Sequence, residues 1–122
     1  MEVNLKKIMI VDDSTAIRCI LKTTLLGEYS VIDAENGKDA FEKAKENKID
    51  LFLLDVNMPV MDGITLTREL RSNPSYEKTP IIILTTESRE EQRKQGKEAG
   101  ANGWIIKPCE PKALLNVLRT ML

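Results

Sequence analysis

Six residues of the kinds that bind phosphate groups or metal ions directly follow apolar segments of this chain. They are, in chain order, Asp12 and Asp13, Asp55, Thr85 and Thr86, and Lys107. Carboxylates held close together repel one another unless a cation or a proton joins them, and oxygen ligands of this kind favour Mg²⁺. One carboxylate could act as the nucleophile in phosphoryl transfer, aided by Mg²⁺, the lysine ammonium and a threonine hydroxyl. The spacing leaves open which aspartate attacks.

Five short segments have the composition of β-strands. Residues 8–11, 51–54, 81–84 and 104–106 are continuous apolar runs, which is typical of strands buried on both faces of a parallel sheet. Residues 29–34 form a weaker run, which we expect to be an edge strand.

Helical spacing of apolar residues occupies most of the segments between these strands. The residues that mark the first helix are Ile17, Ile20, Leu21, Thr24 and Leu25. Ser14 is the expected N-cap of this helix, and Gly27 lies just past its end. Shorter stripes mark a second helix, and a third through Leu66 and Leu70; the last helix has Pro111 in its first turn.

Residues 88–100 are the weakest helical segment. Ala99 is its only strongly apolar residue, and Gly96 interrupts it. We expect either a solvated surface helix or, as the sharper hypothesis, a loosely held element that moves when the site changes state.

The order of elements, β-α repeated five times, predicts a doubly wound α/β sandwich. In such folds the ligand crevice lies outside the carboxyl ends of the strands. The three carboxylates, a threonine hydroxyl and the lysine ammonium group are therefore expected to converge on one pocket.

Composition excludes several classes of protein. The chain has 122 residues, 42% of them hydrophobic and 30% charged, which predicts one domain over residues 1–122, with no output domain. A net charge of −1 gives no indication of binding to nucleic acid or to an anionic membrane. The absence of histidine removes Ser-His and Cys-His catalysis. Cys19, expected to be core or half-buried filler, and Cys109 form no metal-binding or disulfide motif. Without a signal peptide or a long apolar segment we expect a cytoplasmic monomer.

Taken together, these motifs resemble a response-regulator receiver domain. They are Asp12-Asp13 after a strand, the segment from Asp55 to Gly63, Thr85, and Lys107-Pro108. The resemblance covers the chain from Ile8 through the last helix and is closest to stand-alone chemotaxis regulators of the CheY type. It implies a flavodoxin-like (βα)5 fold with a five-stranded parallel sheet in the order 2-1-3-4-5.

The same resemblance implies roles for individual residues. Asp55 would be the phosphoryl acceptor, and Thr85 and Lys107 would contact the phosphoryl oxygens. The expected ligands of Mg²⁺, the implied cofactor, are Asp12, Asp13, Asp55 and the backbone carbonyl of Asn57. Thr85 and Trp104 would form the switch, Lys107-Pro108 would be a cis peptide, and Gly63 would supply unusual backbone angles in the loop after the acceptor. Thr86 remains the alternative pocket hydroxyl.

The implied function is that of a signalling phospho-acceptor in a two-component system rather than an enzyme. A histidine kinase would donate the phosphoryl group. The face formed by the fourth helix, fifth strand and last helix would then change its affinity for a target, with the flagellar motor switch of chemotaxis as first candidate and a phosphatase as a further partner. The chain departs from many chemotaxis regulators after Lys107-Pro108, where Cys109 stands in place of a common aromatic residue. One alternative is a developmental phosphorelay intermediate. Another, in a different class, is a phosphatase of the haloacid-dehalogenase kind, which also uses an aspartate nucleophile. That family has an Asp-x-Asp motif after its first strand, whereas Asp12 and Asp13 are adjacent in this chain.

Overall fold

Five parallel strands form the centre of the structure, a computed structural model that describes residues 5–122. The strands are β1 (Lys7–Val11), β2 (Ser30–Ala34), β3 (Leu51–Leu54), β4 (Ile81–Thr85) and β5 (Gly103–Ile106). Their order across the sheet is β2-β1-β3-β4-β5, and every neighbouring pair is parallel. The predicted fold class and strand order are therefore confirmed.

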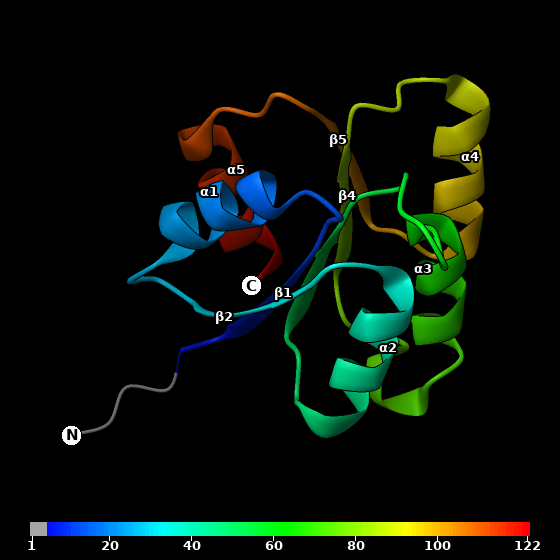
Figure 1. Cartoon of the computed structure of the whole chain (residues 1–122), viewed down its shortest axis with the longest axis horizontal. Helices are drawn as coiled ribbons and strands as arrows, with labels where there is room; N and C mark the ends of the chain where they lie inside the picture. The colour runs from blue at the N-terminus through cyan, green and yellow to red at the C-terminus, as the bar shows by residue number, and fades with distance from the viewer. Residues whose placement is uncertain (1–4) are drawn as a thin grey trace.

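Helices cover both faces of the sheet (Figure 1). Helices α1 (Thr15–Leu25) and α5 (Pro111–Met121) lie on one face. Helices α2 (Gly37–Glu46), α3 (Gly63–Arg71) and α4 (Glu90–Ala99) lie on the other, with a short 3₁₀ turn at Pro74–Tyr76. None of the described helices has both the length and the apolar character that crossing a membrane requires.

Alternate residues of the central strands supply two separate cores. In β1, Ile8 and Ile10 pack with the buried residues of α1 and α5, whereas Met9 and Val11 pack with those of α2, α3 and α4. This alternation follows from the period of two along a strand, and it explains why the central strands are apolar at every position.

The two edges of the sheet differ from each other in how well they were predicted. Strand β2 is an edge strand, as its weaker run indicated. The expectation that residues 104–106 are buried on both faces was wrong, because β5 is the opposite edge and Ile106 is 40% exposed.

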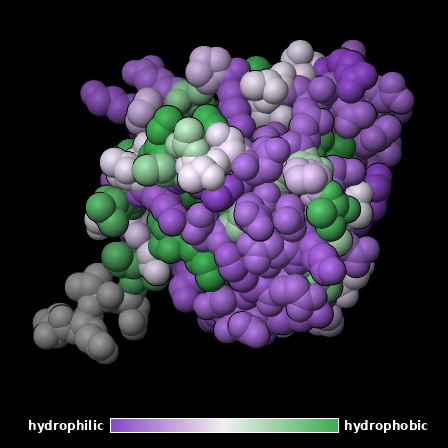
Figure 2. Space-filling model, in the orientation of Figure 1, coloured by the Kyte–Doolittle hydropathy of each residue, from purple (hydrophilic) through white to green (hydrophobic). Residues whose placement is uncertain are grey.

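Helix α1 confirms its predicted ends but not its predicted buried face. The Ser14 side chain accepts a hydrogen bond from the amide of Ile17, and Gly27 adopts a φ of 95° just beyond the helix. Leu21 and Leu25 are buried, but Ile20 is 59% exposed and Cys19 is exposed rather than core filler. Figure 2 shows hydrophobic residues gathered on the side of the molecule where α1 lies.

Helix α4 is continuous through Gly96, so the expected interruption was wrong. A Cβ atom on Gly96 would lie 2.7 Å from Cζ3 of Trp104, so this glycine leaves room for the indole ring. The helix buries only Gly96 and Ala99, and its N-terminus has no side-chain cap. Its small buried surface agrees with the solvated helix expected here, and its movement stays a prediction.

Candidate functional site

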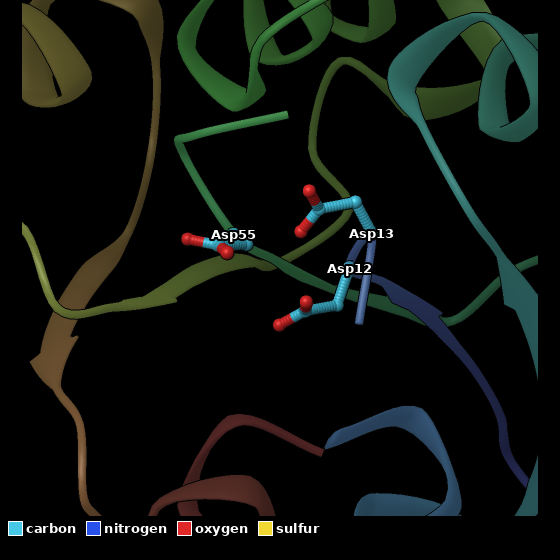
Figure 3. Close-up of side chains that lie close together, drawn as sticks. All are labelled: Asp12, Asp13 and Asp55. Carbon is cyan, nitrogen blue, oxygen red and sulfur yellow. The ribbon is translucent and has the colours of Figure 1, made fainter. Parts of the chain in front are cut away.

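Three carboxylates lie together at the carboxyl ends of two adjacent strands (Figure 3). Strands β1 and β3 pair in register with Val11 opposite Leu54, and the next residues are Asp12 and Asp55. The amide of Asp55 donates a hydrogen bond to the carbonyl oxygen of Val11 at 2.9 Å. One carboxylate oxygen from each of Asp12, Asp13 and Asp55 lies within 4.8 Å of the others. The structure thus brings together the three acidic residues predicted as metal ligands.

Lys107, which follows β5, reaches two of these carboxylates. Its Nζ atom lies 2.7 Å from Oδ2 of Asp12 and 3.4 Å from Oδ2 of Asp55. The side chain of Asp12 is only 3% exposed, and its Oδ1 accepts a hydrogen bond from the amide of Ser14 at 2.9 Å. Buried carboxylates need such partners, so the ammonium group acts as a counterion for the cluster.

Asp55 is buried and is held by its own loop. Its Oδ1 accepts a hydrogen bond from the amide of Val56 at 2.7 Å. The chain then turns tightly into α3, where a Cβ atom on Gly63 would lie 2.0 Å from the carbonyl oxygen of Asp55. The expected reason for Gly63 was therefore wrong. It is the close approach of two backbone segments, and not a positive φ, that requires glycine here.

The positive φ in this loop belongs instead to Val60, at 70°. Asn57 lies in the same loop, two residues after Asp55, and its side chain is exposed. Its assignment as a metal ligand depends on its backbone carbonyl and stays a prediction.

The two candidate hydroxyls differ in their surroundings. Thr85 is fully buried at the end of β4, whereas Thr86 is exposed. The Thr85 carbonyl accepts a hydrogen bond from the amide of Lys107 at 2.8 Å, so Thr85 lies directly beside that lysine. The Thr85 hydroxyl also accepts a hydrogen bond from the amide of Glu87 at 3.2 Å.

Trp104 is connected to the same loop. Its indole N–H donates a hydrogen bond to the carbonyl oxygen of Glu87 at 2.9 Å. Thr85, Glu87 and Trp104 thus form a continuous chain of contacts from the end of β4 to β5. Trp104 also lines an open groove of about 780 Å³ between α4 and β5, together with three basic residues: Arg93, Lys94 and Lys97.

The peptide between Lys107 and Pro108 is cis, as expected. Cys109 follows it and is half-buried against the core beneath α1 and α5. Burial and the neighbouring Glu110 carboxylate raise the pKa of its thiol, so at neutral pH the thiol is protonated and poorly nucleophilic.

The donor set fits a hard divalent cation. All three acidic residues supply oxygen, their atoms are close enough to share one ion, and Asp13 is exposed toward the solvent from which an ion and its waters would arrive. The structure therefore holds three carboxylates and an ammonium group within one cluster.

One residue that touches this cluster was missed in the sequence. The guanidinium of Arg18 in α1 donates a hydrogen bond to the carbonyl oxygen of Asp12. Arg18 lies on a helix beside Cys19 and Lys22, and only the packing of α1 against the sheet distinguishes it from a surface arginine.

Comparison with known proteins identifies the family. Residues 8–119 match the response regulator receiver domain. The chain is 40% identical over 122 residues to the transcriptional regulatory protein ResD of Bacillus subtilis, covering 99% of this chain but only 50% of that protein. It is 38% identical over 119 residues to the chemotaxis protein CheY1 of Helicobacter pylori, covering 95% of this chain and 96% of that one.

Solved structures give the same answer. The chemotaxis protein CheY4 of Vibrio cholerae superimposes with a TM-score of 0.93 at 40% identity, covering 98% of this chain and 100% of that one. The receiver domain of a sensor histidine kinase from Pseudomonas aeruginosa, solved with a magnesium ion coordinated in its active-site cleft, superimposes with a TM-score of 0.89 at 28% identity, covering 97% of this chain and 98% of that one. The chain with this acidic cluster at the strand ends therefore belongs to the response regulator receiver domain family.

Proposed function

We propose that this receiver domain accepts a phosphoryl group on Asp55 from a histidine kinase in a Mg²⁺-dependent reaction. The observation that carries the proposal is the convergence of Asp12, Asp13 and Asp55 with the ammonium group of Lys107. A carboxylate oxygen of Asp55 forms the new bond to phosphorus while the bond between phosphorus and the donor nitrogen breaks.

The other residues of the cluster bind the metal and the phosphoryl oxygens. Asp12, Asp13, Asp55 and the carbonyl of Asn57 are the proposed metal ligands, and bound Mg²⁺ neutralises charge on the phosphoryl oxygens. Lys107 already lies 3.4 Å from Oδ2 of Asp55, where it can stabilise an incoming phosphoryl group. The Thr85 hydroxyl is proposed to donate to a phosphoryl oxygen; because it only accepts from the amide of Glu87, its own hydrogen is free for this bond.

The output of the domain is proposed to be the face formed by α4, β5 and α5. The contacts from Thr85 through Glu87 to Trp104 connect the site to the groove between α4 and β5. A change at Thr85 would therefore alter the affinity of this face for a target protein. The similarity to chemotaxis proteins CheY1 and CheY4 favours the flagellar motor switch as that target.

The first experiment measures covalent phosphate by intact mass after incubation with acetyl phosphate and Mg²⁺. We expect a single phosphate on the wild type and none on Asp55→Asn or without Mg²⁺. Asp50→Asn is the matched control, because Asp50 precedes strand β3 whereas Asp55 follows it, so the two carboxylates lie at opposite ends of the same strand. Failure of the wild type to take up phosphate, with the fold intact, would contradict the proposal.

The lifetime of the phosphate distinguishes the proposed roles. Rapid loss favours chemotaxis, whereas long persistence favours a phosphorelay intermediate. Turnover of an external phosphate ester by the wild type would support the phosphatase alternative instead.

A further inference from the structure

Arg18 connects the acidic cluster to the neighbouring strand β2. Its Nη1 donates to the carbonyl oxygen of Asp12, and its Nε donates to Oδ2 of Asp33 at 2.9 Å. The Arg18 side chain is only 13% exposed although it belongs to a surface helix. A guanidinium has several donors in a rigid planar arrangement, so one side chain can hold two acceptors at a fixed separation.

The acceptor on Asp12 belongs to the peptide group that joins Asp12 to Asp13. The amide of Asp12 donates to the carbonyl oxygen of Ala34 at 3.2 Å, and Oδ1 of Asp12 accepts from the amide of Ser14. The contact with Arg18 holds the remaining polar group of Asp12, its carbonyl. This contact therefore bears directly on the orientation of the peptide that leads to the exposed Asp13.

Arg18 is itself held by a charged partner. Asp33 accepts from Arg18 through Oδ2 and lies 2.9 Å from Nζ of Lys22 through Oδ1. Arg18 and Lys22 both lie on α1 and share the carboxylate of Asp33, but among the described contacts only Arg18 reaches the acidic cluster. Lys22 is therefore a matched control for the charge and for the ion pair.

We propose that Arg18 is a positioning residue, which holds the peptide between Asp12 and Asp13 and so sets the geometry of these carboxylates for Mg²⁺. This inference rests on the proposed function, because it requires the cluster to bind Mg²⁺. Groups that orient metal ligands without touching the metal commonly change its affinity by about 10- to 100-fold.

Electrostatics and positioning predict opposite effects when Arg18 loses its charge. A cation near the site opposes the binding of Mg²⁺, so its removal alone would tighten binding. Loss of the contact with the carbonyl of Asp12 instead frees the peptide and weakens binding. The direction of the change therefore separates the two roles.

The experiment is a calorimetric titration with Mg²⁺ of the wild type, Arg18→Gln and Lys22→Gln, with circular dichroism to verify folding. We expect Arg18→Gln to raise the Kd for Mg²⁺ about tenfold, and Lys22→Gln to change it less than twofold. Arg18→Lys retains the charge and should also weaken binding, because an ammonium group cannot hold both acceptors in the same geometry. It serves as the test if Arg18→Gln does not fold.

Equal or tighter binding by both Arg18 variants would overturn the inference and leave the proposed function standing. An equal loss in Arg18→Gln and Lys22→Gln would also overturn it, since the ion pairs with Asp33 would then explain the effect. A wild type that does not bind Mg²⁺ would overturn the proposed function and, with it, this inference.

Discussion

Gly63 leaves room for the backbone of Asp55 at the start of α3. The loop from Asp55 turns so tightly that a Cβ atom on Gly63 would lie 2.0 Å from the carbonyl oxygen of Asp55 and 3.1 Å from Cα of Val56. The obstructing atoms are backbone atoms, which cannot move aside as the end of a flexible side chain can. The packing of Gly63 and the position of the phosphoryl-acceptor candidate are therefore coupled.

We predict that Gly63→Ala lowers the free energy of unfolding by about 2–3 kcal/mol and reduces phosphorylation of Asp55 by acetyl phosphate. Urea denaturation measures the first effect and intact mass the second. Gly27→Ala is the control. Gly27 has open space around its missing Cβ, so that variant should cost only the strain of its positive φ, about 1 kcal/mol, and leave phosphorylation unchanged. A smaller loss for Gly63→Ala than for Gly27→Ala would argue against the steric explanation.

Helix α4 and strand β5 meet at a glycine and a tryptophan. The indole ring of Trp104 lies over Gly96, and its N–H reaches the loop before the helix at Glu87. Trp104 therefore contacts both the body of α4 and the segment that leads into it. An element that buries so little surface of its own depends on such contacts for its position.

We predict that Gly96→Ala is destabilising, opposite to the usual effect of this change inside a helix. Alanine normally favours a helix by about 1 kcal/mol over glycine, but here its Cβ would lie 2.7 Å from the indole ring. Trp104 is the only tryptophan, so its displacement should also appear as a red shift of the intrinsic fluorescence. The control is Glu98→Ala, an exposed residue of α4 that does not line the groove beside Trp104, which should leave the emission maximum unchanged. A stabilised Gly96→Ala variant with unaltered fluorescence would contradict the packing described here.

Element ends and the order of elements were predictable because they depend on local chemistry. A serine before a helical stripe forms an N-cap, and a glycine after it adopts a positive φ; Ser14 and Gly27 do both. The position of the acidic cluster and of Lys107 was also predictable, because the carboxyl ends of parallel strands lie on the same side of the sheet. The contacts of Arg18 with Asp12, and of Trp104 with Gly96, join segments whose relative position is set by the tertiary fold. No periodicity in the sequence records these contacts.

At the scale of the whole molecule, arginine side chains connect segments distant in sequence. Arg71, at the end of α3, donates to the carbonyl oxygens of Tyr76, Thr79 and Gly100, and so joins the loop before β4 to the end of α4. Arg18 joins α1 to β1 and β2. Both guanidinium groups therefore stabilise the packing of helices on the sheet. Most of the acceptors just named are backbone carbonyls; the carboxylate of Asp33, which accepts from Arg18, is the one among them that titrates.

That carboxylate, Asp33, makes the stability of the fold depend on pH. Burial raises the pKa of Asp33, but hydrogen bonds from Lys22 and Arg18, together with their charges, lower it by more, so its pKa in the folded protein lies below its ordinary range. The unfolded chain then takes up a proton at a higher pH than the folded one. The stabilisation is therefore fully present above the ordinary pKa of an aspartate, about 4, and is lost as the pH falls through the lower pKa of the folded state.

We predict that the free energy of unfolding decreases as the pH falls below about 4, and that Asp33→Asn flattens part of this decrease while lowering stability at pH 7 by about 1 kcal/mol. Urea denaturation between pH 3 and pH 7 measures both effects. Glu28→Gln is the control. Arg119 lowers the pKa of Glu28 through a hydrogen bond, but both side chains are exposed, so their screened interaction should leave the acid slope nearly unchanged. If the free energy of unfolding fell equally with pH in Asp33→Asn and in the wild type, the pKa of Asp33 would be the same in the folded and the unfolded chain. The ion pairs of Asp33 with Arg18 and Lys22 would then not stabilise the fold. The orientation of Arg18 would then have to come from its contacts with Asp12 and with the hydroxyl of Thr15.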